Sequence, residues 1–582
     1  MKIIDRERFI IKEYWLAIVI AMVVAFIYFA PYFLSLFENE YKGVLFTSLD
    51  SEVHYLARLN EISEGYWNYA STYLYEYKDS STVVNQYSDV LYGLIVGLLG
   101  ISVVSFYLFA KIFFAFLNYL LWYFLSYLLS NNKKFSILTA LFVTIGYTVK
   151  ENINITDQIN ILFWKGDVSN FLVFSRIVNP LVVHPFFIIS IILLFLFFKK
   201  NQLKYSIWFG VLLGLNYYLF FYSWVYLLVV AFLLILYFVI YKKFDEVKKL
   251  ACGLFLSFVL GVYYFYMMFK LAFFSFAEDA TAGALSLFES THEIILSKYV
   301  FFIFLIFLVY LIYKKVRIKD VSTSDIFLLL LISGSIIVVN QQVLTGMLVE
   351  EGHFHWYINT PITSIVLAYL IYYTSSFFKK KSLNIFVFSF FLIYFIFFGL
   401  GYQLSAYGNV KEEFIKKQRY AEFYEWLNKN SDFDSVVMTN GSISNSVPAY
   451  THNNVYFSEY IKHYSSTPFE RRVNAFYVNY ILEKGEINCD NLDYSASDKL
   501  MKDWVYFKYL RGRGTEVPVE IKDAVFGGCQ NYDNRDFYDI LNEYRLDYIL
   551  WDKDLNPGWE IDKYDFVEEI YNKNNIFLYK II

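Results

Sequence analysis

Long apolar runs alternate along the chain with short groups of Lys and Arg residues. Short cytoplasmic loops of membrane proteins collect Lys and Arg, so we expect these basic groups to face the cytoplasm. Two neighbouring groups must then be separated by an even number of membrane spans. The six groups are Lys2/Arg6/Arg8/Lys12, Lys133/Lys134, Lys199/Lys200/Lys204, Lys242/Lys243/Lys248/Lys249, Lys314/Lys315/Arg317/Lys319 and Lys379/Lys380/Lys381.

A membrane span needs about 20 apolar residues. In two stretches the number of spans follows only from the rule that neighbouring basic groups are separated by an even number of spans. Residues 90–130 are long enough for two spans but are allowed one, so 90–99 is expected to be a short interfacial helix. Residues 205–241 must hold two short spans, with a turn in the polar, aromatic segment 216–223. The sequence predicts about eleven spans, with the N-terminus inside and the C-terminus outside: 14–36, 103–129, 135–149, 179–198, two within 205–241, 250–269, 299–313, 325–345, 357–378 and 383–402.

Composition supports a polytopic α-helical membrane protein, because 57% of the 582 residues are hydrophobic and 22% are aromatic. The first run, 14–36, is too long for a cleaved signal peptide and is expected to remain in the protein. Residues 1–402 should form the membrane module, with 37–89 as a large first outer loop. Residues 403–582 hold 29 acidic and 21 basic residues and no spanning run. We expect them to form an extracytoplasmic domain.

The C-terminal segment shows alternating helical and strand patterns, which predict a small α/β domain. Helices are expected at 410–429, 468–484 and 496–511, and strands at 435–440, 452–457, 547–552 and twice within 566–582. Glycine-rich phosphate loops and common hydrolase motifs are absent from this sequence.

Two of the three cysteines, Cys489 and Cys529, lie in the predicted outward domain, and Cys252 lies in a span. A disulfide between Cys489 and Cys529 would suit an oxidising compartment. Two unpaired thiols are an equally good interpretation of the sequence.

Polar residues gather first in the outer loop, in the segment TSLDSEVHYLARLNEISEGYW. If a helix begins just after Asp50, then Asp50, His54 and Arg58 share one polar stripe of a helix lying on the bilayer surface. The alternative is structural: Asp50 caps the helix, and Arg58 is an exposed partner of Glu61.

A second polar group precedes and enters the fourth span and contains Asp157, Asp167, Arg176 and His184. A charge that borders the membrane is costly unless it has a partner or a function. Arg176 could extend to the interface, or its guanidinium fork could bind a phosphate headgroup ahead of the Asn179-Pro180 break.

A third polar group, NQQVLTGMLVEEGHFHWYINTP, includes His353 and His355 at the outer end of the ninth and tenth spans. The two histidines are two residues apart, so they cannot share a helical face. Hydrogen bonding to a headgroup or a sugar is a better interpretation than a metal site built on these residues alone.

Several of these features together resemble the GT-C superfamily of membrane glycosyltransferases. The resemblance rests on the acidic first-loop stretch LDSEVHYLARLNEISEG, the Arg-x-x-Asn-Pro segment at 176–180 and the outward tail with DSVVMTNGSISNSVPAYTHNNVYF. The tail has no WWDYG-type segment, which argues against an oligosaccharyltransferase. The second acidic motif is reduced to Gly166-Asp167.

The resemblance implies a glycosyltransferase of the cytoplasmic membrane and cell envelope. Its donor would be a polyprenyl-phosphate-linked sugar, and its acceptor an extracytoplasmic glycan, lipid or protein; nucleic acid is not expected as a partner. Asp50 would be the catalytic base, because the reaction must take a proton from the acceptor hydroxyl. Arg176, with Arg58 or His184, would stabilise the charge on the leaving phosphate. If the reaction needs Mg²⁺ or Mn²⁺, Asp50, Glu52 and Asp167 offer oxygen ligands.

Two alternatives use the same outer polar residues without catalysis. A transporter or flippase of lipid-linked sugars would bind the donor without reacting with it, and such proteins usually bury ionisable residues within their spans. A non-catalytic envelope assembly protein would use the outer tail to bind a partner.

Overall fold

The computed structural model describes residues 3–582 except 49, 68–69, 81–87, 152–153, 169, 275–286, 376–380, 465, 488, 490–493, 507–516 and 534. Side chains next to some of these gaps, including that of Asp50, also lie outside the description. The chain forms two compact units. Unit 1 comprises residues 1–39, 105–264 and 290–414, and unit 2 comprises residues 40–104, 265–289 and 415–582.

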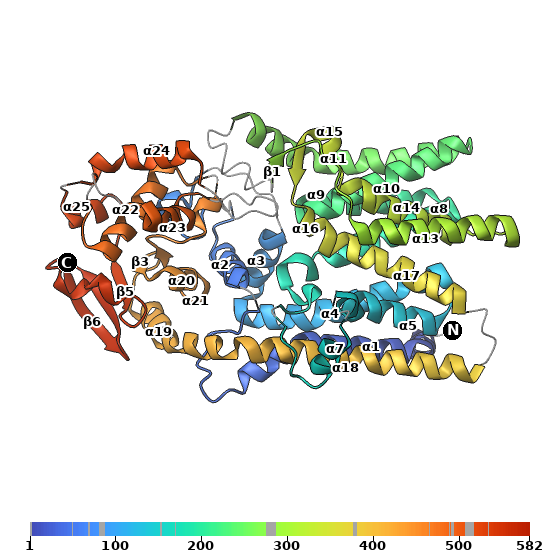
Figure 1. Ribbon diagram of the computed structural model, residues 1–582, viewed down its shortest axis with the longest axis horizontal. Helices are drawn as coiled ribbons and strands as arrows, with labels where there is room; N and C mark the ends of the chain where they lie inside the picture. Colours follow the sequence, from blue (N-terminus) through green and yellow to red (C-terminus); the bar gives the residue numbers. More distant parts are fainter. Residues whose placement is uncertain are drawn as a thin grey trace. The chain divides into compact units, whose positions relative to one another are not determined.

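Unit 1 is helical, and its long helices run side by side (Figure 1). Three of its helices, α4, α11 and α18, extend into segments of unit 2. The elements are α1 (Ile3–Leu36), α4 (Val103–Ser130), α5 (Lys133–Leu141), η2 (Phe142–Gly146), α6 (Tyr147–Glu151), α7 (Ile155–Leu162), η3 (Val173–Ser175), η4 (Ile177–Leu181), α8 (His184–Lys200), α9 (Leu203–Leu219), α10 (Phe221–Ile240), α11 (Phe244–Phe274), α13 (Lys298–Tyr313), η5 (Lys314–Ile318), α14 (Thr323–Val338), α15 (Gln342–Thr345), β2 (Met347–Val349), α16 (Glu351–His353), η6 (Phe354–Asn359), α17 (Thr360–Ser375) and α18 (Lys381–Lys417).

Local sequence explains where several of these helices begin and end. The predicted turn within 205–241 lies at Phe220, whose extended backbone (φ −159°, ψ 113°) separates α9 from α10. Helix α14 begins with a capping box in which Ser322 and Asp325 exchange hydrogen bonds. The buried Lys314 Nζ lies 2.6 Å from Asp325 Oδ2. This ion pair fixes the turn between α13 and α14.

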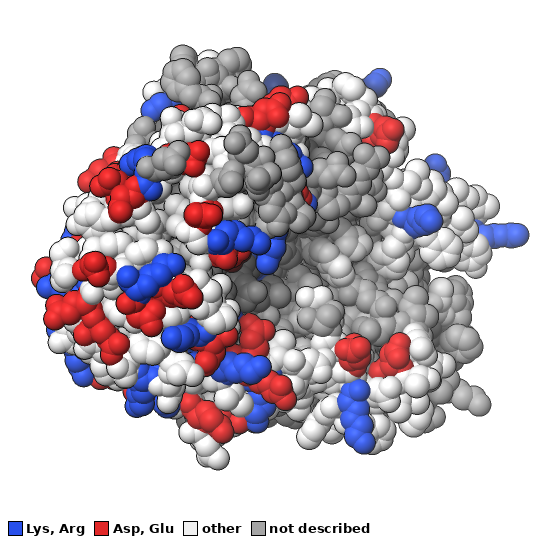
Figure 2. Space-filling model, turned by 60° about the vertical axis from the view of Figure 1, so that its left-hand side comes forward, with Lys and Arg blue, Asp and Glu red and all other residues white. Residues whose placement is uncertain are grey.

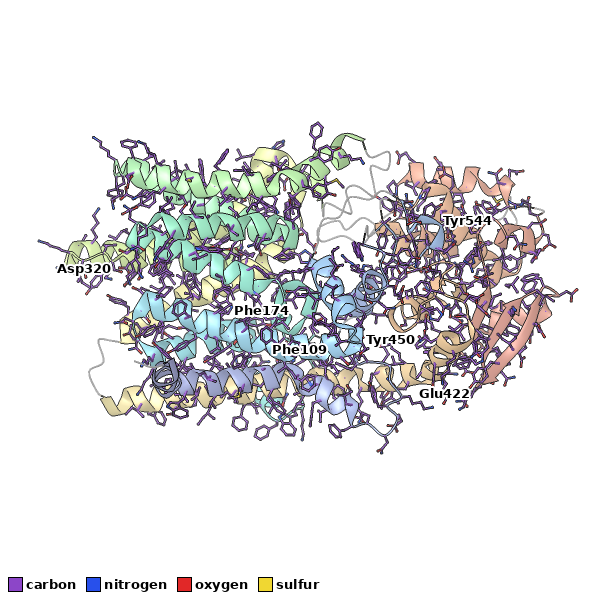
Figure 3. All side chains as sticks on the ribbon, turned by 180° about the vertical axis from the view of Figure 1, so that it is seen from behind. Phe109, Phe174, Asp320, Glu422, Tyr450 and Tyr544 are labelled. Carbon is purple, nitrogen blue, oxygen red and sulfur yellow. A yellow bond between two sulfur atoms is a disulfide. The ribbon has the colours of Figure 1, made fainter. Side chains whose placement is uncertain are left out.

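Within the described part of the chain, helical elements overlap each of the eleven predicted spans, but they differ in length. Among the described residues, seven helical segments are long and apolar enough to cross a membrane: Tyr14–Leu36, Val103–Ser130, Ile177–Lys200, Phe221–Ile240, Phe244–Lys270, Lys298–Ile318 and Ile385–Asn430. Their surfaces carry apolar side chains, and Phe26, Phe109 and Phe232 are each more than half exposed (Phe109, Figure 3). Such surfaces suit a lipid environment. The number of eleven spans, and the side of the membrane that each loop faces, remain predictions.

Unit 2 contains the five-stranded sheet, in the order β4-β3-β5-β7-β6. Strand β3 is parallel to β4 and β5, whereas β7 is antiparallel to both β5 and β6. The strands are β3 (Val436–Thr439), β4 (Asn454–Val455), β5 (Tyr548–Asp552), β6 (Val567–Lys573) and β7 (Ile576–Ile581); the further strand β1 (Leu287–Ser290) ends at the boundary between the units. All five strands predicted for the tail are confirmed. The β6–β7 hairpin turns through Asn574 and Asn575, which have positive φ as a two-residue hairpin turn requires.

Helices and short turns surround this sheet, and the predicted helix at 468–484 is confirmed as α22. The prediction at 496–511 is met by α23 up to Trp504, and residues 507–511 lie outside the described part. The helical elements of unit 2 are α2 (Asp50–Ser63), η1 (Tyr75–Tyr77), α3 (Ser88–Leu99), η7 (Gln418–Tyr420), α19 (Ala421–Asn430), α20 (Gly441–Ser444), α21 (Val447–Tyr450), η8 (Ile461–His463), α22 (Phe469–Lys484), α23 (Tyr494–Trp504), α24 (Val519–Gly527), η10 (Cys529–Asn531), α25 (Phe537–Leu541), η11 (Pro557–Trp559) and η12 (Ile561–Lys563).

The first loop of the sequence folds together with the C-terminal segment in unit 2. The amide of Val455 in β4 donates to the carbonyl of Tyr73 at 2.9 Å, and Arg471 Nε lies 2.6 Å from Glu76 Oε1. Cys489 and Cys529 form a disulfide in the same unit. The compact unit therefore combines residues 40–104 and 265–289 with 415–582, and the functional division into 1–402 and 403–582 remains a prediction. The assignment of these parts to the membrane and the outside remains a prediction.

Figure 2 shows Lys, Arg, Asp and Glu side chains interspersed on the face formed largely by unit 2. Glu422 illustrates this mixing, because its carboxylate lies 3.1 Å from Lys42 Nζ and 2.5 Å from Lys573 Nζ (Glu422, Figure 3). A surface of this kind is typical of a domain exposed to water.

Candidate functional site

Arg176 lies between two short helical turns that precede the long helix α8. The 3₁₀ turn η3 ends at Ser175, and the π-helical turn η4 begins at Ile177. Within η4, Asn179 leaves helical geometry before Pro180, so the predicted break is confirmed. The Arg176 side chain is half-buried, and its Nη1 donates a hydrogen bond to the Tyr357 hydroxyl at 3.1 Å.

Tyr357 is the common partner of the predicted polar residues in unit 1. It lies in a second π-helical turn, η6, and its side chain is buried. The buried His184 places Nε2 2.9 Å from the Tyr357 carbonyl oxygen, so this nitrogen is the donor. The Tyr357 ring contacts Phe220 at a centroid distance of 5.8 Å. Tyr357 therefore joins the entry to α8, the α9–α10 turn and the segment before α17.

His353 also packs on Tyr357, with the two rings stacked at a centroid distance of 5.1 Å. Its Nδ1 lies 2.7 Å from Glu350 Oε2, and its ring meets that of Tyr222 edge-on. His355 instead packs against Trp356. As expected, the two histidines face different neighbours.

Three of the five predicted phosphate-binding residues thus gather around one tyrosine: Arg176, His184 and His353. We call these residues together with Tyr357 the Tyr357 cluster. Phe174, which precedes Arg176 by two residues, packs on His184 at 5.1 Å and borders this cluster (Phe174, Figure 3). Sequence reasoning missed Tyr357, because one tyrosine among 55 carries no distinguishing pattern.

The predicted catalytic residue, Asp50, is the first residue of α2 in unit 2, so the helix predicted to begin just after it is confirmed and includes Asp50 itself. Its side chain lies outside the described residues. Glu52, one of the predicted metal ligands, is buried, and its Oε2 accepts a 2.6 Å hydrogen bond from the Ser48 amide. In this position Glu52 stabilises the entry to α2.

Two residues of the polar stripe predicted for α2, His54 and Arg58, contact other parts of unit 2, and the position of this helix on the bilayer surface remains a prediction. The His54 Nδ1 is 2.8 Å from the Tyr73 hydroxyl, and its ring stacks on Tyr460 at 4.5 Å. Arg58 is buried and forms an ion pair with Asp89 of α3, so it is not the exposed residue of the structural alternative. The helix packs on α3 and α21 within unit 2, and this packing covers its polar side chains.

Glu61 takes part in another buried group, which joins α2 to the start of β3. Lys78 Nζ lies 3.1 Å from Glu61 Oε1 and also binds Asp434, which accepts a hydrogen bond from the Tyr66 hydroxyl. Burial raises the pKa of Glu61 to about 8 and the pKa of Glu64 to about 7. Burial acts in the same direction on Asp434, but hydrogen bonds from Lys78 and Tyr66 outweigh it and lower its pKa. We call Glu61, Glu64, Lys78 and Asp434 the Lys78 cluster.

The predicted metal ligands are only partly described. Asp167 is exposed, and the neighbouring Gly166 amide donates to Ser405 Oγ at 3.2 Å. Within the described ranges, no group of three or more His, Cys, Asp or Glu residues could hold a metal ion. The described part of Asp50, Glu52 and Asp167 does not form a ligand set for Mg²⁺ or Mn²⁺, so we derive no step that uses a metal.

Lys111 is a charged residue that sequence reasoning missed. It is buried in the first third of α4, and its Nζ lies 3.5 Å from the centroid of the Tyr32 ring in α1. The predicted topology used clusters of Lys and Arg. Lys111 is a single basic residue in an apolar run between two such clusters, so it was not singled out. A buried lysine in a candidate span is nevertheless costly, and it is stabilised here by a cation–π contact.

No protein-family model matches the chain, and no curated protein matches it in sequence. Solved structures of the Archaeoglobus fulgidus oligosaccharyltransferase are similar at 11–12% identity with TM-scores of 0.41–0.42. The form tethered to an acceptor peptide covers 93% of this chain and 73% of that one, the apo form 94% and 70%, and the complex with Zn and sulfate 93% and 68%. Similarity at this level identifies neither the activity nor the site residues of this chain.

Proposed function

We propose that the chain is a GT-C type glycosyltransferase of the cytoplasmic membrane. It would transfer a sugar from a polyprenyl-phosphate donor to an extracytoplasmic glycan, lipid or protein. The observation that carries the proposal is the Tyr357 cluster, in which a half-buried guanidinium is held by a tyrosine beside two histidines. An arginine held in this way suits the phosphate of a lipid-linked donor.

The chemistry assigns a role to each proposed group. The acceptor oxygen forms a bond to the anomeric carbon while the bond from that carbon to the phosphate oxygen breaks, and the electron pair leaves with the phosphate. The acceptor proton passes to the Asp50 carboxylate, which acts as general base. Arg176 stabilises the negative charge that grows on the phosphate. His184 and His353 support this arginine through Tyr357, and Arg58 is assigned to unit 2 packing by its ion pair with Asp89.

The proposal is tested by incubating the purified full-length protein in detergent with a radiolabelled polyprenyl-phosphate-linked sugar and candidate acceptors. Transfer appears as loss of label from the polyprenyl-phosphate donor and its gain by a glycan, a different lipid or a protein. A panel of donor sugars is needed, because the sequence does not identify the sugar. If the label stays on the polyprenyl-phosphate donor with every donor and acceptor tested, the proposal that the chain is a glycosyltransferase is contradicted.

A flippase of lipid-linked sugars is the second candidate, and Lys111 favours it. Ionisable residues within spans often line transport pathways, and Lys111 is buried in α4. In proteoliposomes, a flippase would move a fluorescent lipid-linked sugar between leaflets without consuming it, and Lys111→Met would slow that movement. A glycosyltransferase would instead convert the donor in one leaflet.

A further inference from the structure

The Tyr357 hydroxyl binds one end of the Arg176 guanidinium. Arg176 Nη1 donates to this oxygen at 3.1 Å, and the tyrosine side chain is buried. A guanidinium is a planar fork with five N–H donors, so one hydrogen bond at one end restricts the direction of the whole fork. A lone tyrosine can therefore decide how an arginine presents its charge to an anion.

Tyr357 is well suited to such a role, because three other contacts hold it in place. Its carbonyl oxygen accepts the hydrogen bond from His184 Nε2 at 2.9 Å. Its ring packs on His353 at 5.1 Å and on Phe220 at 5.8 Å. The π-helical turn η6 adds one residue to the helical turn at this point, and such turns are frequent at functional sites.

We infer that Tyr357 is a positioning residue that orients the Arg176 guanidinium toward the phosphate of a lipid-linked donor. The inference rests on the proposed function and names a residue that the sequence did not single out. Tyr357 acts through Arg176 and takes no part in the bond changes. Precise support of a binding group by its neighbours is what makes the group effective, so loss of the hydroxyl alone should reduce binding.

The first experiment measures binding of farnesyl phosphate and of farnesol to the full-length protein in detergent. The two probes share an isoprenoid chain, and only the first carries a phosphate. Tyr357→Phe removes the hydroxyl and keeps both the ring and the backbone carbonyl that His184 uses. We expect roughly a ten- to 150-fold weaker affinity for farnesyl phosphate, as for the loss of one hydrogen bond to a charged group, with farnesol binding unchanged.

A matched control is Tyr226→Phe, which also removes a buried tyrosine hydroxyl in unit 1. The Tyr226 hydroxyl donates to the Leu331 carbonyl at 2.8 Å and belongs to the packing of α10 on α14. This variant should bind both probes as the wild type does. Equal losses in Tyr357→Phe and Tyr226→Phe would reflect general loosening of the helices and would overturn the inference.

A double-mutant cycle separates positioning from a purely structural role. If Tyr357 acts through the guanidinium, Tyr357→Phe should have little further effect on farnesyl phosphate affinity once Arg176→Ala is present. Additive losses in the double variant would overturn the inference. Thermal unfolding in the same detergent establishes that each variant is folded; should Tyr357→Phe unfold, Tyr357→His, which retains a ring and a polar group, replaces it in the cycle.

The outcomes also distinguish this inference from the proposed function. If the wild type shows no preference for farnesyl phosphate over farnesol, the phosphate site itself is absent and the proposed function loses its support. If the wild type shows the preference, and Arg176→Ala abolishes it while Tyr357→Phe retains it in full, only the role of Tyr357 is wrong.

Discussion

A lysine at position 176 would keep the positive charge of the arginine but not its shape. The ammonium group is a compact point charge, whereas the guanidinium offers two parallel donors to a phosphate and a separate one to Tyr357. We therefore expect Arg176→Lys to weaken binding of farnesyl phosphate roughly ten-fold. Arg317→Lys, at an exposed residue of η5, is the matched control and should have no effect. Normal affinity in Arg176→Lys would show that the site needs charge alone.

Asp50→Asn separates the catalytic interpretation of Asp50 from the structural one. Asparagine begins a helix as well as aspartate does, but its amide cannot accept the acceptor's proton. We expect a folded protein whose rate of sugar transfer falls by roughly two to four orders of magnitude. Asp79→Asn, at an exposed residue of the same loop, should transfer normally. Near-normal transfer by the Asp50→Asn variant would leave Asp50 as a helix-capping residue and direct attention to Glu52 and Asp167.

The sequence predicted part of the Tyr357 cluster because charge is costly next to a membrane. That argument selected Arg176 and His184, and expected hydrogen bonding to a headgroup or a sugar selected His353; all three share a partner. It could not select Tyr357, since a tyrosine at the interface needs no special explanation. It also misjudged Arg58, because the partner Asp89 is 31 residues further along the chain and lies on another helix. Contacts between distant segments carry no local pattern.

At the scale of helices, α9 and α11 approach closely through small residues. A Cβ atom on Gly210 would overlap the carbonyl oxygen of Gly253, and one on Gly253 would overlap that of Ser206. Small residues allow this approach in membrane helices. We expect Gly210→Val to lower thermal stability in detergent by about 1–3 kcal/mol or to prevent folding. Gly408→Ala is the control, because its added Cβ atom meets nothing within 4 Å. An unchanged melting temperature for Gly210→Val would contradict the close approach.

The Lys78 cluster links α2 to β3 and makes the stability of unit 2 dependent on pH. The pKa of Glu61 rises from 4.5 to about 8 on folding, so the folded state holds its proton more tightly than the unfolded state. This contribution is complete below about pH 4.5 and is lost as pH rises through 8. Glu64, with a pKa of about 7, acts in the same direction. Asp434 has a lowered pKa, so its contribution to stability is present at neutral pH and is lost at low pH.

Unfolding measured between pH 5 and 9 should therefore show a loss of stability toward the alkaline end. Glu61→Gln mimics the protonated side chain and should flatten this dependence. The exposed pair of Lys429 and Glu425 offers a control, since Glu425→Gln should leave the slope unchanged. A slope that persists in full in Glu61→Gln would assign the pH dependence to other groups.

Periodicity predicted most elements, and the exceptions have physical reasons. Strands β3 and β5 were found because each is a short apolar run that is buried along its whole length. Helix α2 was placed correctly, but its contacts within unit 2 were not predicted, because an amphipathic pattern does not identify what covers the polar side. The π-helical turns η4 and η6 were not predicted either, since segments of five and six residues are too short to show a period of their own.

For the whole molecule, the sidedness of the chain is the prediction on which the functional proposal depends. The basic groups containing Lys134, Lys200, Lys243, Lys315 and Lys380 should be cytoplasmic, and the tail beyond Gln403 should be outside. In a Cys252→Ser background, single cysteines replacing Lys200 and Asp554 can be labelled with a membrane-impermeant reagent in intact cells. We expect labelling at 554 and protection at 200; the reverse pattern would place the tail inside and exclude the proposed reaction.

Assembly of unit 2 has a consequence for how the protein is made. Arg471 and Glu76, which meet in the folded unit, are 395 residues apart in the chain. At a synthesis rate of about 5–20 residues per second, the first segment must wait roughly 20–80 s for the tail to emerge. During that interval the segment from α2 to α3 lacks the β-sheet of the folded unit, in which its charged residues Arg58 and Lys78 are buried. We therefore expect the nascent first loop to need a chaperone until the tail emerges. Slowing translation between residues 104 and 415 should increase degradation of the nascent protein.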